Sequence, residues 1–333
     1  PVVPARRDAA GGLVALGEGG RPESMMRIEM SPVPARLLGA GAPPPADWNG
    51  VRDALAAAMA ENRRAVADFP AMLGRLRDTA AALDARDPEA AAFLRWLEGD
   101  NFVLLGHRLL HLDGAALRAD EDLGILRDPA VPVFDALRDL GRVAAPVREA
   151  LDAPATITVA KANLRTRVHR PAHCDVVGVR LFDANGRTVA VRVFLGLFAA
   201  SAYNRNPRSI PWLASKVERV LRAAGADPDS HDGRALRNIL DTWPRDELFQ
   251  AGENEILAGA RRALDLAIRP RPALVLRRDP FERFVSAIVW LPRDSFDTRL
   301  RERVGRMVAE AFNGRLSTFY IALGDGPLAR VLF

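Results

Sequence analysis

The chain has 333 residues, of which 49% are hydrophobic and 27% charged, which is ordinary for a globular protein long enough for two or three domains. No apolar run reaches the roughly 18 residues that a membrane span needs, and no signal-peptide pattern opens the sequence. The single cysteine, Cys174, excludes an internal disulfide framework and is typical of a reducing cytoplasm. We therefore expect a cytoplasmic protein without a membrane partner.

The charge balance argues against a nucleic-acid partner despite a formal net charge of +5 and a pI near 10.2. Lys161 and Lys216 are the only lysines, so arginine supplies almost all of the basicity, and its guanidinium titrates far above neutral pH. The 47 cations alternate with 42 acids, a pattern typical of solvated helix faces. Aromatic residues make up only 6% of the chain, too few for a stacking surface. A basic nucleic-acid-binding protein is therefore the weakest of the functions considered.

The first forty residues predict strands rather than helices. Residues 2–7 and 13–16 flank a turn-rich loop at 8–12, which predicts a hairpin, and residues 25–30 predict a further strand. Because no helix precedes these strands, we interpret residues 1–40 as the C-terminal part of a domain that begins upstream. The segment AGAPPPAD, at 40–47, predicts a proline-rich linker and a domain boundary.

Helical periodicity begins at Trp48 and predicts a helical linker over residues 47–98. Apolar residues recur at spacings of three, four and seven from Trp48 to Val66. Pro70 interrupts this pattern and predicts the start of a new helix. Asp87 followed by Pro88 predicts another helix start, because the aspartate caps exposed N–H groups and proline lacks the donor that would go unsatisfied.

Residues 99–206 predict an antiparallel sheet of about the size of a PAS-like domain. The expected strands cover residues 102–112, 156–160, 175–182 and 188–198, with a weaker run near 124–126. The last two long strands flank a turn, DANGR at 183–187, that predicts a hairpin. Between the strands at 156–160 and 175–182 lies a basic connector, residues 161–171.

Helices return in residues 207–268, and a compact α+β unit follows at 271–333. The expected helices cover 210–224, a segment beginning after Ser230, and 245–267, with Gly225 ending the first. In the last unit, strands at 273–277 and 284–291, a helix at 298–312, and strands at 316–323 and 328–332 give a β-β-α-β-β order. The fold class predicted for the whole chain is α+β, built from several modules with antiparallel sheets and helices.

Neither metal nor nucleophile chemistry is predicted. His107 and His111 fall in a strand pattern, where four residues span about 13 Å, so that one zinc ion could not bind both. His173 and Cys174 are adjacent and would point to opposite faces of an extended strand, which weakens a site with His169. We interpret the histidines as satisfied core or seam residues. Nucleotide-binding fingerprints and a serine-nucleophile elbow are both missing, so we expect no catalytic residue here.

The basic connector and two nearby segments supply the candidate site residues. Arginine and lysine beside asparagine and threonine donors could clamp a carboxylate or a phosphate, because guanidinium forks match planar anions. Alternatively, these groups pair with acids of an adjacent domain that lies outside this chain and form a polar seam, which is the interpretation we favour. The candidates for a ligand site or domain interface are Lys161, Asn163, Arg165, Arg167, His169, Arg170, Tyr203, Asn204, Arg205, His231 and Asp232.

Several ordered segments resemble the large bacterial NAD-specific glutamate dehydrogenases over essentially the whole chain. None of the segments is a catalytic signature, but together they are numerous and in the same order. They are FLRWL at 93–97, NFVLLGH at 101–107, KAN at 161–163, VHRP at 168–171, FLGLF at 194–198, AYNR at 202–205, SHDGRA at 230–235, PRDELF at 244–249, RRDPF at 277–281 and NG at 313–314.

The resemblance implies a non-catalytic region of such an enzyme. Residues 1–40 would be the end of a first ACT-like domain, 99–206 a PAS-like domain and 271–333 a second ACT-like domain. The catalytic lysine and the NAD fold would lie downstream, so that NAD is the cofactor of the parent enzyme and the chain itself holds none. The parent reaction would be the oxidative deamination of L-glutamate to 2-oxoglutarate.

The same resemblance implies regulation and assembly. ACT-like modules pair sheets side by side and often bind amino acids, so the expected partners are other domains of the same chain, further copies of it and an amino-acid effector. A freestanding small-molecule sensor built from the same modules is the alternative. The beginning of the chain within an incomplete domain, and its end directly after a strand pattern, argue against that alternative.

Overall fold

The computed structural model describes residues 2–17, 19–24, 26–27, 47–113, 116–131, 155–324 and 326–333. The chain divides into two compact units, Pro1–Asp53 and Ala54–Phe333. The predicted linker at 40–46 and residues 28–30 of the predicted third strand lie outside the described residues. Among the described helices, none is both long enough and apolar enough to cross a bilayer.

The N-terminal unit contains a three-stranded antiparallel sheet in the order β2-β1-β3. Strands β1 (Val2–Arg7) and β2 (Leu13–Leu16) confirm the predicted hairpin. The third strand was predicted at 25–30; β3 covers Arg21–Ser24, and residues 26 and 27 are not in a strand, while residues 25 and 28–30 lie outside the described residues. β3 pairs with β1 along its backbone, and a cross-strand ion pair adds to this pairing, in which Arg7 donates to both carboxylate oxygens of Glu23 at 2.8 and 2.7 Å. The alternation of apolar residues, from which strands are predicted, does not reveal an ion pair between two strands.

A single helix, α1 (Trp48–Leu83), replaces the two helices predicted on either side of Pro70. Proline removes one backbone hydrogen bond, but Pro70 itself is exposed. Burial of Ala65, Met72 and Leu76 on both sides of it favours continuity of the helix. The next helix, α2 (Pro88–Trp96), confirms the predicted start, because the Asp87 carboxylate accepts the N–H of Ala90 at 2.9 Å. A π-helical turn, Leu97–Asn101, ends the helical region.

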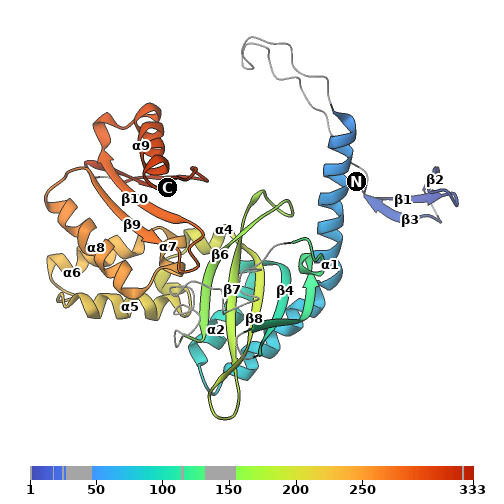
Figure 1. Cartoon of the computed structure of the whole chain (residues 1–333), viewed down its shortest axis with the longest axis horizontal. Helices are drawn as coiled ribbons and strands as arrows, with labels where there is room; N and C mark the ends of the chain where they lie inside the picture. The colour runs from blue at the N-terminus through green and yellow to red at the C-terminus, as the bar shows by residue number, and fades with distance from the viewer. Residues whose placement is uncertain are drawn as a thin grey trace, which may run out of the picture. The chain divides into compact units, whose positions relative to one another are not determined.

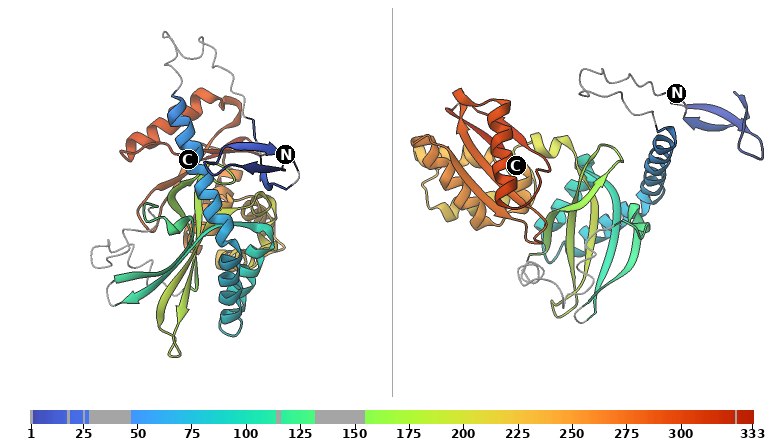
Figure 2. Two further views of the ribbon diagram at one scale, coloured as in Figure 1. Left: turned by 90° about the vertical axis from the view of Figure 1, so that its right-hand side faces the viewer. Right: turned by 45° about the horizontal axis from the view of Figure 1, so that its top comes forward.

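The central sheet is antiparallel, with the strand order β5-β4-β8-β7-β6. The hairpin of β7 and β8 confirms the predicted turn at 183–187 and is seen from two further directions in Figure 2. The run near 124–126 was predicted as a strand, but a 3-10 turn (Ile125–Arg127) begins there, because Gly124 leaves the sheet at φ 65°. The strands are β4 (Phe102–Asp113), β5 (Ala116–Gly124), β6 (Ile157–Thr166), β7 (Ala172–Phe182) and β8 (Thr188–Phe198).

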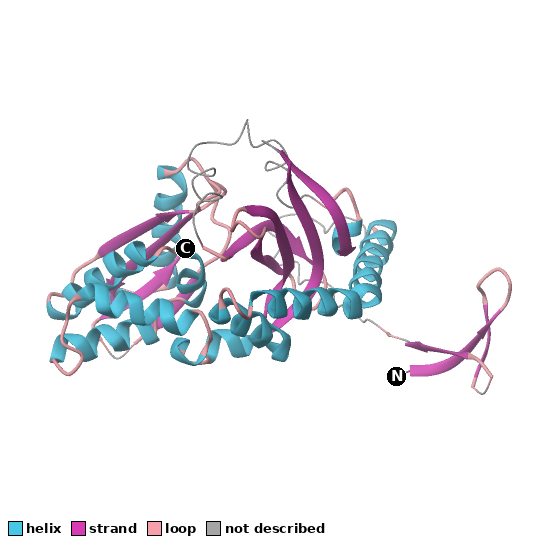
Figure 3. Ribbon diagram, turned by 90° about the horizontal axis from the view of Figure 1, so that it is seen from below, coloured by secondary structure: helices cyan, strands magenta, loops and turns pink. Residues whose placement is uncertain are grey.

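Strand β6 corrects the prediction of a connector at 161–171. Residues 161–166 continue the strand beyond residue 160, and only the residues up to Pro171 form a connection. The register shifts between Lys161 and Arg165, so a bulge gives this half of the strand its irregular apolar pattern. The C-terminal half of α1 and α2 cover one face of the central sheet, where Met72, Leu76 and Phe93 pack with residues such as Phe194 (Figure 3).

The helical segment that follows contains α4 (Ala200–Asn204), α5 (Leu213–Ala224), α6 (His231–Asp241), α7 (Arg245–Gln250) and α8 (Glu253–Ile268). Gly225 ends α5 at φ 70°, as predicted, and the Ser230 hydroxyl caps α6. The single helix predicted at 245–267 was wrong. Ala251 is extended, and the Glu255 side chain accepts the N–H of Gly252 at 2.8 Å, so a new helix begins after Gly252.

The C-terminal sheet has the order β11-β12-β10-β9 and confirms the predicted β-β-α-β-β succession. Helix α9 packs on one face, and α6 and α8 lie on the other (Figure 1). The three antiparallel sheets with their helices confirm the α+β class. The elements are β9 (Ala273–Arg278), β10 (Val285–Pro292), α9 (Thr298–Ala311), β11 (Tyr320–Leu323) and β12 (Leu328–Leu332), and the short 3-10 turns are Pro207–Ser209 and Arg293–Ser295.

Candidate functional site

A buried ionic network joins the central sheet to helix α7. The Lys161 ammonium lies 2.6 Å from Asp175 Oδ1 and 3.2 Å from Asp246 Oδ1. The Tyr203 hydroxyl donates to the same Asp246 oxygen at 3.0 Å. Asp175 is 1% exposed, and its second oxygen accepts the N–H of Phe198 at 3.0 Å. Three elements, β6, β7 and α7, therefore meet at a single ammonium group.

The electrostatics of this network keep the lysine charged. Burial opposes the charge on Lys161, but the carboxylates of Asp246 and Asp175 outweigh it and raise the pKa of the ammonium well above its ordinary value. Burial raises the pKa of the Asp175 carboxyl, and the Lys161 charge only partly offsets this. Burial and the nearby Asp246 carboxylate raise the pKa of the Tyr203 phenol, so it stays protonated and donates its hydrogen bond.

Helix α7 carries three consecutive charged residues that reach three different elements. Arg245 donates to the carbonyl of Arg205 at 2.8 Å, at the end of α4. Asp246 pairs with Lys161 of β6 and accepts the hydrogen bond of the Tyr203 hydroxyl of α4. Glu247 binds Arg277 of β9 through two hydrogen bonds of 2.7 and 2.8 Å. We call α7 together with these partners the α7 junction.

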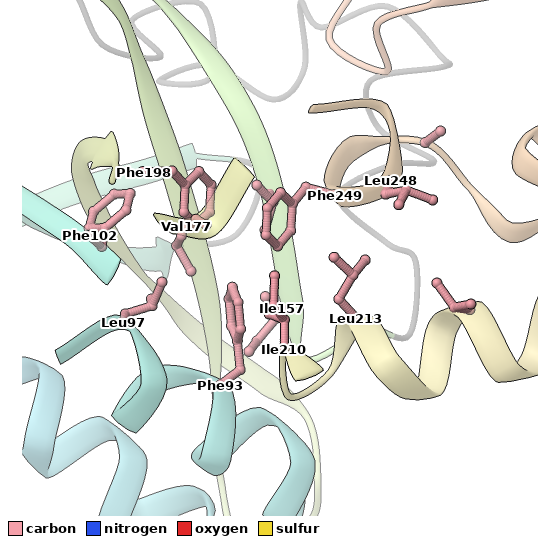
Figure 4. Close-up of a cluster of buried hydrophobic side chains, with 14 of the residues drawn as sticks. Phe93, Leu97, Phe102, Ile157, Val177, Phe198, Ile210, Leu213, Leu248 and Phe249 are labelled. Carbon is pink, nitrogen blue, oxygen red and sulfur yellow. The ribbon is translucent and has the colours of Figure 1, made fainter. Parts of the chain in front are cut away.

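The C-terminal end of α7 is held by a lysine and by ring stacking. Lys216 of α5 donates to the Phe249 carbonyl at 3.3 Å, and burial lowers the pKa of this ammonium to about 8. The Phe249 ring stacks on Phe198 of β8 with centroids 4.5 Å apart and planes at 4°. Figure 4 shows these two rings within the cluster of buried side chains that the central sheet, α2 and α5 share. Apolar packing and charge pairing thus converge on the same short helix.

The structure brings together some of the predicted site residues and separates others. Lys161 and Tyr203 belong to the network, and Arg170 donates to the carbonyl of Phe198 at 2.8 Å. Arg165 donates to the Pro171 carbonyl at 3.2 Å from an exposed position. His231 and Asp232 begin α6, with 91% and 62% of their side chains exposed. The remaining candidates lie at exposed positions: Asn163, Arg167, His169, Asn204 and Arg205.

The sequence did not identify Asp175 of the ionic network, nor the junction residues Arg245, Asp246, Glu247 and Arg277. Two signals pointed to them. Asp175 is an acid inside an otherwise apolar strand run, which predicts a buried partner. Asp246 and Glu247 lie in the PRDELF segment, where they were read only as a mark of resemblance. For Lys161, the prediction that its acidic partners lie in a domain outside the chain was wrong, because Asp175 of its own sheet and Asp246 of the helical segment pair with it.

His107 is buried without the hydrogen bonds expected of a satisfied core histidine. Its side chain is 0% exposed, and neither ring nitrogen has a hydrogen-bond partner among the residues that the structure describes; Nδ1 lies 3.7 Å from Glu121 Oε2. Burial and the nearby charge of Arg192 lower the pKa of His107 to about 4. The interpretation of His107 as hydrogen-bonded was therefore wrong. Among the described residues, no group of three or more His, Cys, Asp or Glu side chains could hold a metal ion.

Two family models match the C-terminal part of the chain. Residues 210–269 match helical motif 1 of glutamate dehydrogenase, and residues 273–333 match its ACT2 domain. The first match covers α5 to α8, including α7, and the second covers the C-terminal sheet and α9.

Similar proteins extend the match to the rest of the chain. An NAD-specific glutamate dehydrogenase of Halomonas elongata is 33% identical over 305 residues, or 87% of this chain and 19% of that protein. The enzyme of the same name from Pseudomonas aeruginosa is 30% identical and covers 100% of this chain with 21% of its own length. That of Mycobacterium tuberculosis is 27% identical over 100% of this chain and 20% of its own length. The chain thus spans about one fifth of these relatives.

Proposed function

The chain is homologous over its whole length to the large NAD-specific glutamate dehydrogenases, and we propose that it is a regulatory and assembly segment of such an enzyme. In this proposal the parent protein oxidises L-glutamate to 2-oxoglutarate and ammonium in the cytoplasm. NAD binds to another part of the parent protein. The partners of the segment are the other domains of the parent and further copies of the chain.

The α7 junction is the observation that supports a non-catalytic role. A catalytic group needs a free proton, lone pair or charge that it can offer to a substrate. In the network, Lys161 is already bound by two carboxylates, and the Asp246 oxygen receives both Lys161 and Tyr203. The bidentate pair of Arg277 and Glu247 is 4% and 7% exposed. These charges serve to hold the modules of the segment in a fixed arrangement.

An amino-acid effector is the regulatory part of the proposal. The ACT2 match supports it, and the exposed cations of the 165–170 segment are the groups that the chain offers to a carboxylate. Such an effector would act on the parent through a coupling free energy of about 1–3 kcal/mol.

Calorimetric titration of the chain with a panel of amino acids tests this proposal. We expect heat of binding from at least one amino acid and a loss of roughly tenfold in affinity in Arg165→Ala and Arg167→Ala, because each substitution removes a charge-assisted hydrogen bond. Arg187→Ala, which changes an exposed arginine in the β7–β8 turn, is the matched control. If no amino acid gives heat of binding, the proposal of an amino-acid effector is contradicted, and only the role of the segment in assembly remains.

A further inference from the structure

Two consecutive residues of α7 are bound to two different sheets. Asp246 pairs with Lys161 of β6 in the central sheet. Glu247 pairs with Arg277 of β9 in the C-terminal sheet. Their α-carbons are one peptide unit apart, about 3.8 Å. At α7 the two sheets are therefore joined through one peptide unit and two ion pairs.

The geometry leaves α7 little freedom to move at one ion pair without moving at the other. The fork of Arg277 binds both oxygens of Glu247 at 2.7 and 2.8 Å, so it fixes the orientation of the carboxylate as well as its position. The helix has only six residues, and Pro244 and the extended Ala251 bound it. Lys216 and the stack of Phe249 on Phe198 hold its far end. A shift of β9 must therefore displace α7 as one body.

The burial of the ion pairs makes such a displacement costly. Arg277 and Glu247 are 4% and 7% exposed, so separating them would leave both charges without water or partner. Lys161 and Asp246, on the other side, are 21% and 15% exposed, so their separation costs less, and Lys161 would keep Asp175 as a partner. Phe281, in the connection between β9 and β10, also packs against an apolar cluster of the central sheet. This contact is apolar and lacks the fixed geometry of a two-pronged ion pair. The contact of Ser317 Oγ with His173 Nε2 at 3.3 Å is exposed and adds little.

We propose that α7 is the element that couples the C-terminal sheet to the central sheet, with Glu247 and Asp246 as its two contact points. A ligand or partner that shifts β9 changes the stability of β6 through this helix. The reverse holds as well, because coupling free energy between two sites is reciprocal. The proposal concerns the chain by itself and goes beyond the proposed function.

Hydrogen exchange of the whole chain, followed by mass spectrometry on peptides from β6 and β9, tests the coupling. In Arg277→Met we expect the exchange of β6 amides beside Lys161 to rise roughly tenfold or more, as well as that of β9. In Lys161→Met we expect the β9 amides to respond in the same way. Glu247→Gln, which keeps the shape of the side chain, replaces Arg277→Met if that variant does not fold.

Two control variants distinguish an effect that reaches β6 through α7 from a general loss of stability of the chain. Val331→Ala opens a cavity on the α9 side of the C-terminal sheet, away from α7, and we expect it to raise exchange in β10 and β12 but not in β6. Arg278→Met changes a 72% exposed neighbour of Arg277, and we expect the exchange of β6 and β9 amides to stay at the wild-type rate. Wild-type exchange of β6 in Arg277→Met, or an equal rise of β6 exchange in Val331→Ala, would overturn the proposal.

Discussion

Replacing Lys161 by methionine is expected to lower the free energy of unfolding of the chain by about 3 kcal/mol. The substitution removes the cation that lies 2.6 Å from Asp175 and 3.2 Å from Asp246. Asp175 would keep only the N–H of Phe198, although its side chain has almost no access to water. The value is at the lower end for a broken buried ion pair because the Lys161 side chain retains 21% exposure. Urea unfolding measures the loss.

The matched control for this experiment is Arg165→Met on the same strand. Arg165 is exposed and donates only to a backbone carbonyl at 3.2 Å, so we expect a change within about 0.5 kcal/mol. The double variant Lys161→Met with Asp175→Asn should recover part of the loss, since it removes the uncompensated charge. A loss below about 1 kcal/mol in Lys161→Met, as for a surface pair, would contradict a structural role for the network.

Lowering the pH from neutral to about 4 is expected to cost the chain about 3 kcal/mol of stability through His107 alone. Below the ordinary histidine pKa, near 6.5, the unfolded chain binds a proton that the folded chain does not take up until about pH 4. The folded state therefore loses stability as pH falls through this interval and is most stable above it. Burial is the main cause, and Arg192 and Arg75 add to it against the charges of Glu121 and Asp122.

The contribution of His107 is isolated by comparing the wild type with His107→Leu across this pH interval. The variant lacks the titrating group, so its free energy of unfolding should fall less steeply, by the same 3 kcal/mol or so. His111→Gln, on the same strand but 38% exposed, is the control and should follow the wild type. Parallel pH profiles of wild type and His107→Leu would show that His107 does not set the acid sensitivity.

Local patterns predicted most of the fold. The β7–β8 hairpin follows from a turn segment between two apolar runs, and the starts of α2 and α6 follow from capping residues at Asp87 and Ser230. The errors arose where a distant contact outweighs a local signal. Pro70 lies within α1 because residues on both sides of it pack on the central sheet. Strand β5 carries three consecutive acids at 120–122, so its sequence lacks the apolar alternation of a strand; Glu121 and Asp122 pair with Arg75 of α1 and Arg108 of β4.

The candidate site was predicted only in part, because the residues that complete it lie far from Lys161 in the sequence. Lys161 is conspicuous in sequence because it is one of two lysines, and Tyr203 lies in a segment that carries the resemblance. Their partner Asp246 is 85 residues beyond Lys161 by number and has no local mark of burial. Glu247 and Arg277 lie in two other segments that carry the resemblance, 30 residues apart, and nothing local indicates that they form a buried pair. Only tertiary structure reveals which charges of an arginine-rich chain are buried.

The most direct test of the non-catalytic role is the rate of NADH formation when the purified chain is mixed with L-glutamate and NAD. We predict no NADH above the background without protein, because the proposal assigns turnover to another part of the parent enzyme. A purified NAD-specific glutamate dehydrogenase of full length serves as the positive control. Steady NADH formation that rises in proportion to the concentration of the chain would contradict the assignment of this segment to regulation and assembly.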